Sequence, residues 1–172
     1  MFSRYKYRNW QKNIPSNLIE YMFSPCKNGL RLVNFFFQKI MGINGQIKLM
    51  VHFTSIVGGD LTIGKGVAVS FANSGGCYIQ GINGIVIDDF TIFAPGVKII
   101  SANHDKQNFK LHEITNPVRI GKNCWIGTNS VILPGVVLGD NITVGAGSIV
   151  TKSFPNNVTI AGVPARIIDS VI

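Results

Sequence analysis

The sequence is poor in cysteine, histidine and acidic side chains. Its 172 residues include three cysteines and three histidines. Cys26, Cys77 and Cys124 are odd in number and widely spaced, which excludes a fully paired disulfide framework and disfavours a zinc site. Because no apolar leader follows Met1, we expect a cytoplasmic protein whose thiols stay free in a reducing compartment.

Long apolar runs are also missing. The longest, residues 30–43, is interrupted by Arg31, Asn34, Gln38 and Lys39. It is too short to cross a bilayer, which takes about 20 consecutive apolar residues. Contact with the inner face of the membrane is therefore the closest association with lipid that the sequence suggests.

Acidic residues number eight against sixteen Lys and Arg, and the excess of positive charge lies at one end. Residues 1–48 hold eight basic side chains and a single acid, Glu20, whereas the other 124 residues hold eight basic side chains and seven acids. The larger part of the chain is thus nearly neutral and supplies no basic groove. We expect no nucleic-acid partner, because basicity at one end does not by itself indicate one.

Apolar residues recur at helical spacing inside the basic end. They are Leu30, Val33, Phe36, Phe37 and Ile40, and this pattern predicts a basic amphipathic helix. One interpretation is that the helix caps the open end of the fold or packs on a neighbouring subunit. The other is that it anchors the protein to a membrane surface.

The main feature that the sequence does contain is a six-residue repeat from Ile120 to Phe154. Its lines read IGKNCW, IGTNSV, ILPGVV, LGDNIT, VGAGSI and VTKSFP. The first position is apolar in every line, the fourth is Asn or Gly in five, and the fifth is small or apolar. The same phase recurs less regularly upstream, in IGKGVA from Ile63, IDDFTI from Ile87 and FAPGVK from Phe93.

A period of six matches neither an α-helix, with about 3.6 residues per turn, nor a plain strand, with a period of about 2. It fits a chain that runs straight, turns and repeats, so that every sixth side chain points at one axis. Gly and Asn suit the corners because they tolerate positive φ. We expect an all-β parallel β-helix over residues 61–168, after a basic helical and irregular segment over residues 1–60. Excursions are expected near residues 70–86 and 100–119.

One histidine lies where the second excursion leaves the coil. His104 stands in SANHD, shortly after Ile99, and imidazole is suited to acid–base work near neutral pH. His112, inside the excursion, is expected to be solvated or to contact a neighbour, and His52, in a strand-like run, to be structural. No cysteine or serine lies in a nucleophile motif, which disfavours a covalent enzyme intermediate.

The stretch from Asn116 through Arg166 resembles the hexapeptide-repeat acyltransferases. The likeness is closest to the galactoside and maltose acetyltransferases and to the O-acetyltransferases that modify capsule and O-antigen polysaccharides. It is strong over residues 116–168, extends over residues 60–168 and does not reach the first fifty residues. The resemblance implies a left-handed β-helix, a homotrimer with the coenzyme between subunits, acetyl-CoA as acetyl donor, and no metal.

The resemblance also implies roles for single residues. His104 matches the general base of the sugar enzymes, and the backbone N–H of Thr128 matches the group that faces the thioester and meets the oxyanion. The coenzyme positions are Trp125, Thr128, Ala146, Thr151, Lys152 and Arg166, and the acceptor positions are Asn73, Asn103 and Asp105. Asn103, Asp105 or a main-chain carbonyl would hold the second ring nitrogen of His104. Asp169 stands where the sugar enzymes carry a second arginine, so we expect weaker or rearranged phosphate contacts.

These expectations add up to acetyl transfer from acetyl-CoA to a sugar hydroxyl, with cell-surface polysaccharide precursors as acceptors. Three alternatives stay open: an N-acetyltransferase acting on an amino sugar, a γ-type carbonic anhydrase, and a scaffold without activity. The carbonic anhydrases bind zinc through three histidines between subunits, two of them on adjacent coils. Here the closest pair, His104 and His112, lies within one excursion, which disfavours that reading.

Overall fold

A computed structural model describes residues 25–170, with side chains from Asn28 onward. The side chain of Cys26 and most of the basic N-terminal stretch lie outside the described residues. In chain order the elements are α2 (Pro25–Phe35), the π-helix η3 (Phe36–Ile40), β1 (Ile56–Ile63), α3 (Ala68–Asn73), β2 (Tyr78–Ile87), β3 (Ile92–Phe93), β4 (Lys98–Ile100), β5 (Val118–Ile120), β6 (Trp125–Ile126), β7 (Val131–Ile132), β8 (Val137–Leu138), β9 (Thr143–Val144), β10 (Ile149–Val150), β11 (Val158–Gly162) and β12 (Ala165–Ser170).

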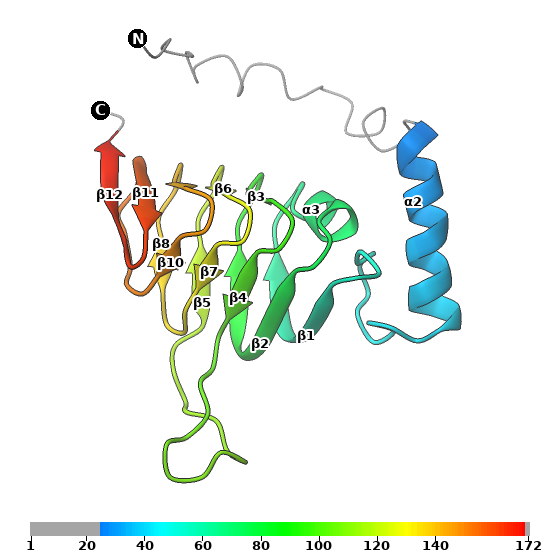
Figure 1. Ribbon diagram of the computed structural model, residues 1–172, viewed down its shortest axis with the longest axis horizontal. Coiled ribbons are helices and arrows are strands. Elements are labelled where there is room, and N and C mark those ends of the chain that lie inside the picture. The colour runs from blue at the N-terminus through cyan, green and yellow to red at the C-terminus, as the bar shows by residue number, and fades with distance from the viewer. Residues whose placement is uncertain (1–24, 171–172) are drawn as a thin grey trace.

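The strands wind into stacked coils with three faces (Figure 1). On the first face, β4, β7 and β10 follow the first half of β2, and on the second face β5 and β8 follow its second half. The third face holds β3, β6, β9 and β11. Every ladder between coils is parallel, and β12 closes the third face by pairing antiparallel with β11.

The side chains of the hexad lie where the repeat predicts. All six first-position residues are buried, and so are all six fifth-position residues, from Cys124 to Phe154. The first-position residues are Ile120, Ile126, Ile132, Leu138, Val144 and Val150. Each coil therefore buries its apolar column against its neighbours, as expected for a solenoid.

The fourth position has positive φ throughout the regular coils. Asn123, Asn129, Gly135, Asn141 and Gly147 all have φ between 55° and 72°. The upstream lines follow the same rule at Gly66, Phe90 and Gly96. Phe90 is the exception in residue type, since a bulky side chain is disfavoured in this region. The corner geometry predicted from Asn and Gly is confirmed.

The region 70–86 differs from a simple excursion. Its first part is the short helix α3, which takes the place of a strand on the third face of the first coil, with Phe71 packed edge-on against Phe93 of β3. Its second part is β2, the longest strand within residues 25–170. The six-residue pattern is interrupted there because β2 has extra residues relative to β1. Gly59 pairs with Gly81, whereas Leu61 pairs with Ile85. The extra residues of β2 form a corner of the coil.

The amphipathic helix predicted near residue 30 is present as α2 and η3, but the side that it turns inward is polar. Asn34 and Gln38 are buried, at 1% and 5% exposure, whereas Val33, Phe36 and Ile40 are exposed. Of the five apolar positions that predicted the helix, Val33, Phe36 and Ile40 thus face away from the fold.

The inversion has a physical cause in the open end of the coil. Asn34 Nδ2 donates to the Ala72 carbonyl, and Asn34 Oδ1 accepts from the Phe53 N–H. Gln38 Nε2 donates to the carbonyls of Ile47 and Leu49, while its Oε1 accepts from the Val51 N–H. Buried backbone groups need partners, and only polar side chains supply them here.

Within residues 25–170, no helix is both long and apolar enough to cross a membrane.

Candidate active site

The second excursion, residues 101–117 between β4 and β5, is a small hairpin that carries His104. The Asp105 N–H donates to the Leu111 carbonyl at 3.0 Å, and the Glu113 N–H donates to the Asn103 carbonyl at 2.9 Å. Asp105 Oδ1 accepts from the backbone N–H groups of Gln107 and Asn108, both at 2.8 Å. This capped turn leaves His104 exposed on the hairpin.

A main-chain carbonyl holds one ring nitrogen of His104. Nδ1 lies 2.7 Å from the carbonyl oxygen of Phe109. A carbonyl only accepts, so Nδ1 carries the proton in the neutral ring and Nε2 keeps its lone pair. Of the three partners expected for this nitrogen, the carbonyl is the one present. Asp105 Oδ1 instead accepts hydrogen bonds from two backbone N–H groups of the turn. The backbone carbonyl of Asn103 accepts from the Glu113 N–H on the facing strand.

His112 lies beside His104 on the opposite strand of the hairpin. The two residues form a bridge, and their ring centroids are 4.7 Å apart with planes tilted by 31°. His112 is exposed, as expected, but its contact with His104 was not. The contact arises because the two strands of the hairpin pair antiparallel and place His104 opposite His112.

Two positions expected to contact the coenzyme lie at a different corner. Thr128 follows β6 and Ala146 follows β9, and both are exposed where the third face meets the first. Thr128 Oγ1 donates to the Pro95 carbonyl at 2.6 Å, and the Thr128 carbonyl accepts from the Gly147 N–H at 2.8 Å. Within residues 25–170, the Thr128 N–H donates to no other group. This N–H is thus available to a ligand at the surface of the corner.

Three further expected residues lie on or beside the third face. Trp125 is an exposed residue of β6, paired with Ile92 and Thr143 of the neighbouring coils. Arg166 is exposed on β12, with Nη1 donating to the Ala165 carbonyl at 2.9 Å. Asn73 ends α3, in the first coil of the same face.

Thr151 and Lys152 lie at the other corner. They follow β10 where the first face turns into the second, which is the corner from which the excursion leaves two coils earlier. Lys152 Nζ is 5.7 Å from the ring centroid of Phe154. One chain therefore places Thr151 and Lys152 at the corner from which the His104 hairpin leaves, and Thr128 and Ala146 at a separate corner.

The two cysteines with described side chains are free and buried. Burial raises the pKa of the Cys77 thiol and of the Cys124 thiol. A protonated, enclosed thiol is a poor nucleophile, so these residues suit packing. His52 is also tied into the structure: burial lowers its pKa, and its ring stacks on Phe53 with centroids 4.7 Å apart. Among the described residues, no three His, Cys, Asp or Glu side chains are grouped to hold a metal ion.

Comparison with known proteins extends the sequence resemblance. Residues 117–152 match the family model of the hexapeptide repeat of succinyl-transferase. Galactoside O-acetyltransferase of Escherichia coli K12 is 34% identical over 143 residues, which cover 76% of this chain and 63% of that protein. WbbJ of the same strain, a candidate lipopolysaccharide biosynthesis O-acetyl transferase, is 35% identical over 73% of this chain and 72% of its own length. The match thus spans less than two thirds of the galactoside enzyme.

Solved structures share the architecture. A maltose O-acetyltransferase from Clostridium difficile 630 superposes with a TM-score of 0.55 and 29% identity, over 89% of this chain and 86% of that one. The Vibrio cholerae acetyltransferase VCA0836, solved with acetyl coenzyme A, superposes with a TM-score of 0.61 at 21% identity and shows the same fold. The family match and the shared architecture confirm the expected left-handed β-helix. This chain belongs to the hexapeptide-repeat acetyltransferases.

Proposed function

We propose that this protein transfers the acetyl group of acetyl-CoA to a hydroxyl group of a sugar, as an enzyme of cell-surface polysaccharide synthesis. The observation that carries the proposal is His104, whose Nδ1 is held by the Phe109 carbonyl, leaving Nε2 as a proton acceptor on an exposed hairpin. A neutral imidazole with a fixed tautomer is the usual general base for such a transfer.

The reaction follows from this tautomer. Nε2 of His104 takes the proton of the sugar hydroxyl as its oxygen attacks the thioester carbonyl, forming a tetrahedral intermediate. The N–H of Thr128 donates to the oxyanion. When the intermediate collapses, the carbon–sulfur bond breaks, and the imidazolium of His104 gives its proton to the leaving thiolate. The products are the acetylated sugar and free coenzyme A, and no metal takes part.

Exposed residues on the third face and its corner form the proposed coenzyme site. Trp125 would flank the reacting groups, and the backbone of Ala146 would contact the pantetheine arm. Arg166 would bind the phosphates, since guanidinium binds phosphate oxygens bidentately. Thr151 and Lys152 would bind the coenzyme from the other corner. Asn73, Asn103 and Asp105 are the proposed sugar contacts.

A homotrimer would complete this site. His104 and Thr128 leave the prism at different corners, so a neighbouring copy that places one corner against another supplies both groups at once. Cyclic assemblies form sites between copies in this way. We propose that the acetyl group passes between a histidine of one subunit and the coenzyme corner of the next.

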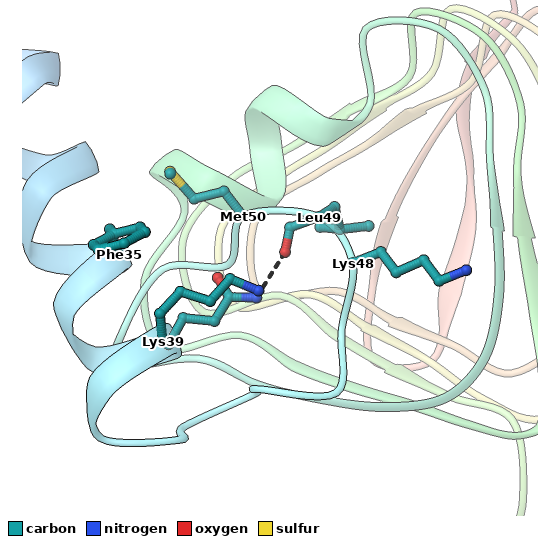
Figure 2. A pocket seen from close by; sticks show the side chains of 6 residues that line it. Phe35, Lys39, Lys48, Leu49 and Met50 are labelled. Carbon is teal, nitrogen blue, oxygen red and sulfur yellow. Dashed lines mark hydrogen bonds between the residues drawn. The ribbon is translucent and has the colours of Figure 1, made fainter.

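The outer side of α2 and η3 is a proposed contact with an anionic membrane surface. Leu32, Phe35, Phe36, Ile40 and Met41 are all exposed there. No acidic residue occurs between positions 21 and 59, whereas Lys39 and Lys48 are exposed beside this surface. Figure 2 shows the hollow between η3 and the segment that follows it, with these two lysines at its edges and Phe35 and Met50 in its lining. Apolar side chains flanked by lysines suit an anionic bilayer.

The test of the transfer is acetyl-CoA consumption, followed by thiol release, with a panel of sugars, amino sugars and nucleotide sugars. We expect turnover with a hydroxyl acceptor, and a loss of about 10²–10⁴ in kcat for His104→Ala with coenzyme affinity kept. His112→Ala is the matched control, because it removes the neighbouring imidazole of the same hairpin. Near-normal turnover in His104→Ala would remove this histidine from the mechanism. Reaction with amino sugars alone would favour the N-acetyltransferase alternative.

A further inference from the structure

One side chain of the preceding coil bonds both ends of the hairpin that carries His104. Asn83 lies in the corner of β2, where the register with β1 shifts. Its Nδ2 lies 3.0 Å from the Ser101 carbonyl, 2.8 Å from the Glu113 carbonyl and 3.0 Å from Thr115 Oγ1. Ser101 opens the excursion, and Glu113 and Thr115 close it. One amide group therefore joins both roots of the hairpin.

Other groups tighten the same attachment. The backbone N–H of Asn83 donates to Ser101 Oγ at 2.9 Å, and Thr115 Oγ1 donates to the Ser101 carbonyl at 3.0 Å. Gln80 holds the first root from the same strand, by accepting from the Ser101 N–H with its carbonyl and from the Ala102 N–H with Oε1. Gln80 touches one root only, whereas Asn83 touches both.

The orientation of the Asn83 amide follows from its partners. The carbonyls of Ser101 and Glu113 only accept, so the nitrogen and not the oxygen of the amide must face them. A carboxylate at this position would place an oxygen against both carbonyls. Asn83→Asp thus reverses the interaction while keeping the size of the side chain.

We infer that Asn83 is a positioning residue for the proposed acetyl transfer: it sets the place of His104 by fixing both roots of the hairpin to the coil. The hairpin holds its own shape through the Asp105 turn and its two cross-strand bonds, so Asn83 governs where the hairpin stands and not whether it forms. This inference rests on the proposed function for its kinetic consequence. Its structural content is independent of that function.

The first test is a double-mutant cycle between positions 83 and 104. Asn83→Asp is expected to lower kcat about 10- to 100-fold, as displacement of a catalytic group does. The KM for acetyl-CoA is expected to stay unchanged, because none of the proposed coenzyme residues lies on the hairpin. In a His104→Ala background the same change is expected to have no further effect, since it acts through His104. A loss of equal size in both backgrounds would overturn the inference.

The second test does not depend on activity. Hydrogen exchange of the Ser101 and Ala102 amides, which bond Gln80 of the coil, is expected to accelerate about tenfold or more in Asn83→Asp, as local opening becomes easier. The Glu113 amide, which bonds Asn103 inside the hairpin, and the amides of β7 and β9 are expected to keep their rates. Unchanged exchange at Ser101 and Ala102 would refute the attachment itself. If the wild type transfers acetyl to no acceptor while these amides respond as expected, the proposed function fails and the attachment stands.

Two further variants control for loss of stability. Asn44→Asp removes a comparable bond, from Nδ2 to the Ser55 carbonyl at 2.8 Å, far from the hairpin in the chain, and is expected to leave kcat unchanged. Thr115→Val removes the hydroxyl that links Asn83 to Ser101 and is expected to lower kcat less than Asn83→Asp. This variant replaces Asn83→Asp in both tests if the latter fails to fold. Full activity and unchanged exchange in Thr115→Val would then overturn the inference.

Discussion

At the scale of single residues, glycine serves this fold in two different ways. Gly135 occupies the fourth position of its hexad with φ of 72°, and a Cβ built there would meet no atom within 4 Å. Gly127 occupies the second position, where a Cβ would lie 2.7 Å from the Ala146 nitrogen and from the Val144 oxygen of the next coil. Position 135 therefore requires a residue that tolerates positive φ, whereas position 127 requires the absence of a Cβ because the coils lie close together.

Substitutions at these two positions should separate the two requirements. Gly135→Asn is expected to change the free energy of unfolding by less than about 0.5 kcal/mol, and Gly135→Val to lower it by about 1–2 kcal/mol, because left-handed backbone is costly for a β-branched residue. Gly127→Ala is expected to cost about 1–3 kcal/mol through overpacking against backbone. Urea unfolding measures all three. Equal stability of the Asn and Val variants at position 135 would contradict the conformational argument.

At the scale of elements, α2 and η3 show how an end of a solenoid is closed. Terminal coils leave backbone groups without a partner coil, and end caps meet this need. Here the cap uses buried amides, those of Asn34 and Gln38, to bond the segment before β1 and the end of α3. With its polar side turned inward, the helix presents its apolar side to the surroundings.

The exposed side of this cap should bind anionic vesicles. We expect the full chain to sediment with vesicles of phosphatidylcholine and phosphatidylglycerol, and less with phosphatidylcholine alone. Leu32 and Ile40 are 71% and 66% exposed, so Leu32→Ser and Ile40→Ser should not disturb the fold. Combined with Lys39→Glu and Lys48→Glu, they are expected to weaken binding roughly tenfold or more.

Two charge reversals elsewhere control for net charge. Lys65→Glu and Lys122→Glu change exposed lysines of the coil and should leave vesicle binding largely intact. Wild-type binding by the variant of α2 and η3 would show that this surface is not the anchor. A change in its oligomeric state instead would identify the surface as a contact between copies of the chain.

At the scale of the whole molecule, the separation of the two corners makes a prediction about assembly. His104→Ala removes the proposed base at one corner, and Ala146→Trp is designed to block the proposed coenzyme site at the other, where Ala146 is exposed. If a site uses one corner from each of two neighbouring subunits, mixed trimers made from equal amounts should regain about a quarter of the wild-type sites. Co-refolding of the two inactive variants, followed by the acetyl-transfer assay, measures this.

Two outcomes would contradict a shared site. No recovery of activity on mixing, with subunit exchange verified by mass, would place base and coenzyme on one chain. An active monomer in light scattering would do the same. The size of the recovery is informative because it depends on how many sites receive an intact corner from each side.

The sequence by itself determined the coil. Ile126 and Ile132 are buried and Asn123 and Gly135 take positive φ because each hexad position meets a local demand that recurs every six residues. Such demands can be read in order along the chain. The candidate base His104 was also visible, since it stands where the period breaks.

Tertiary structure alone decided how the proposed base, His104, is held and which side of the helix faces the fold. Asn83 bonds Glu113 across 30 residues and Asn34 bonds Ala72 across 38, and no local pattern marks such pairs. The same holds for the Phe109 carbonyl and the ring of His112, which meet His104 only after the hairpin closes. The burial of the hexad side chains follows from the pattern of each short segment. The hydrogen bonds of Asn83 and Asn34 form only when distant segments come together, because their buried polar groups need partners.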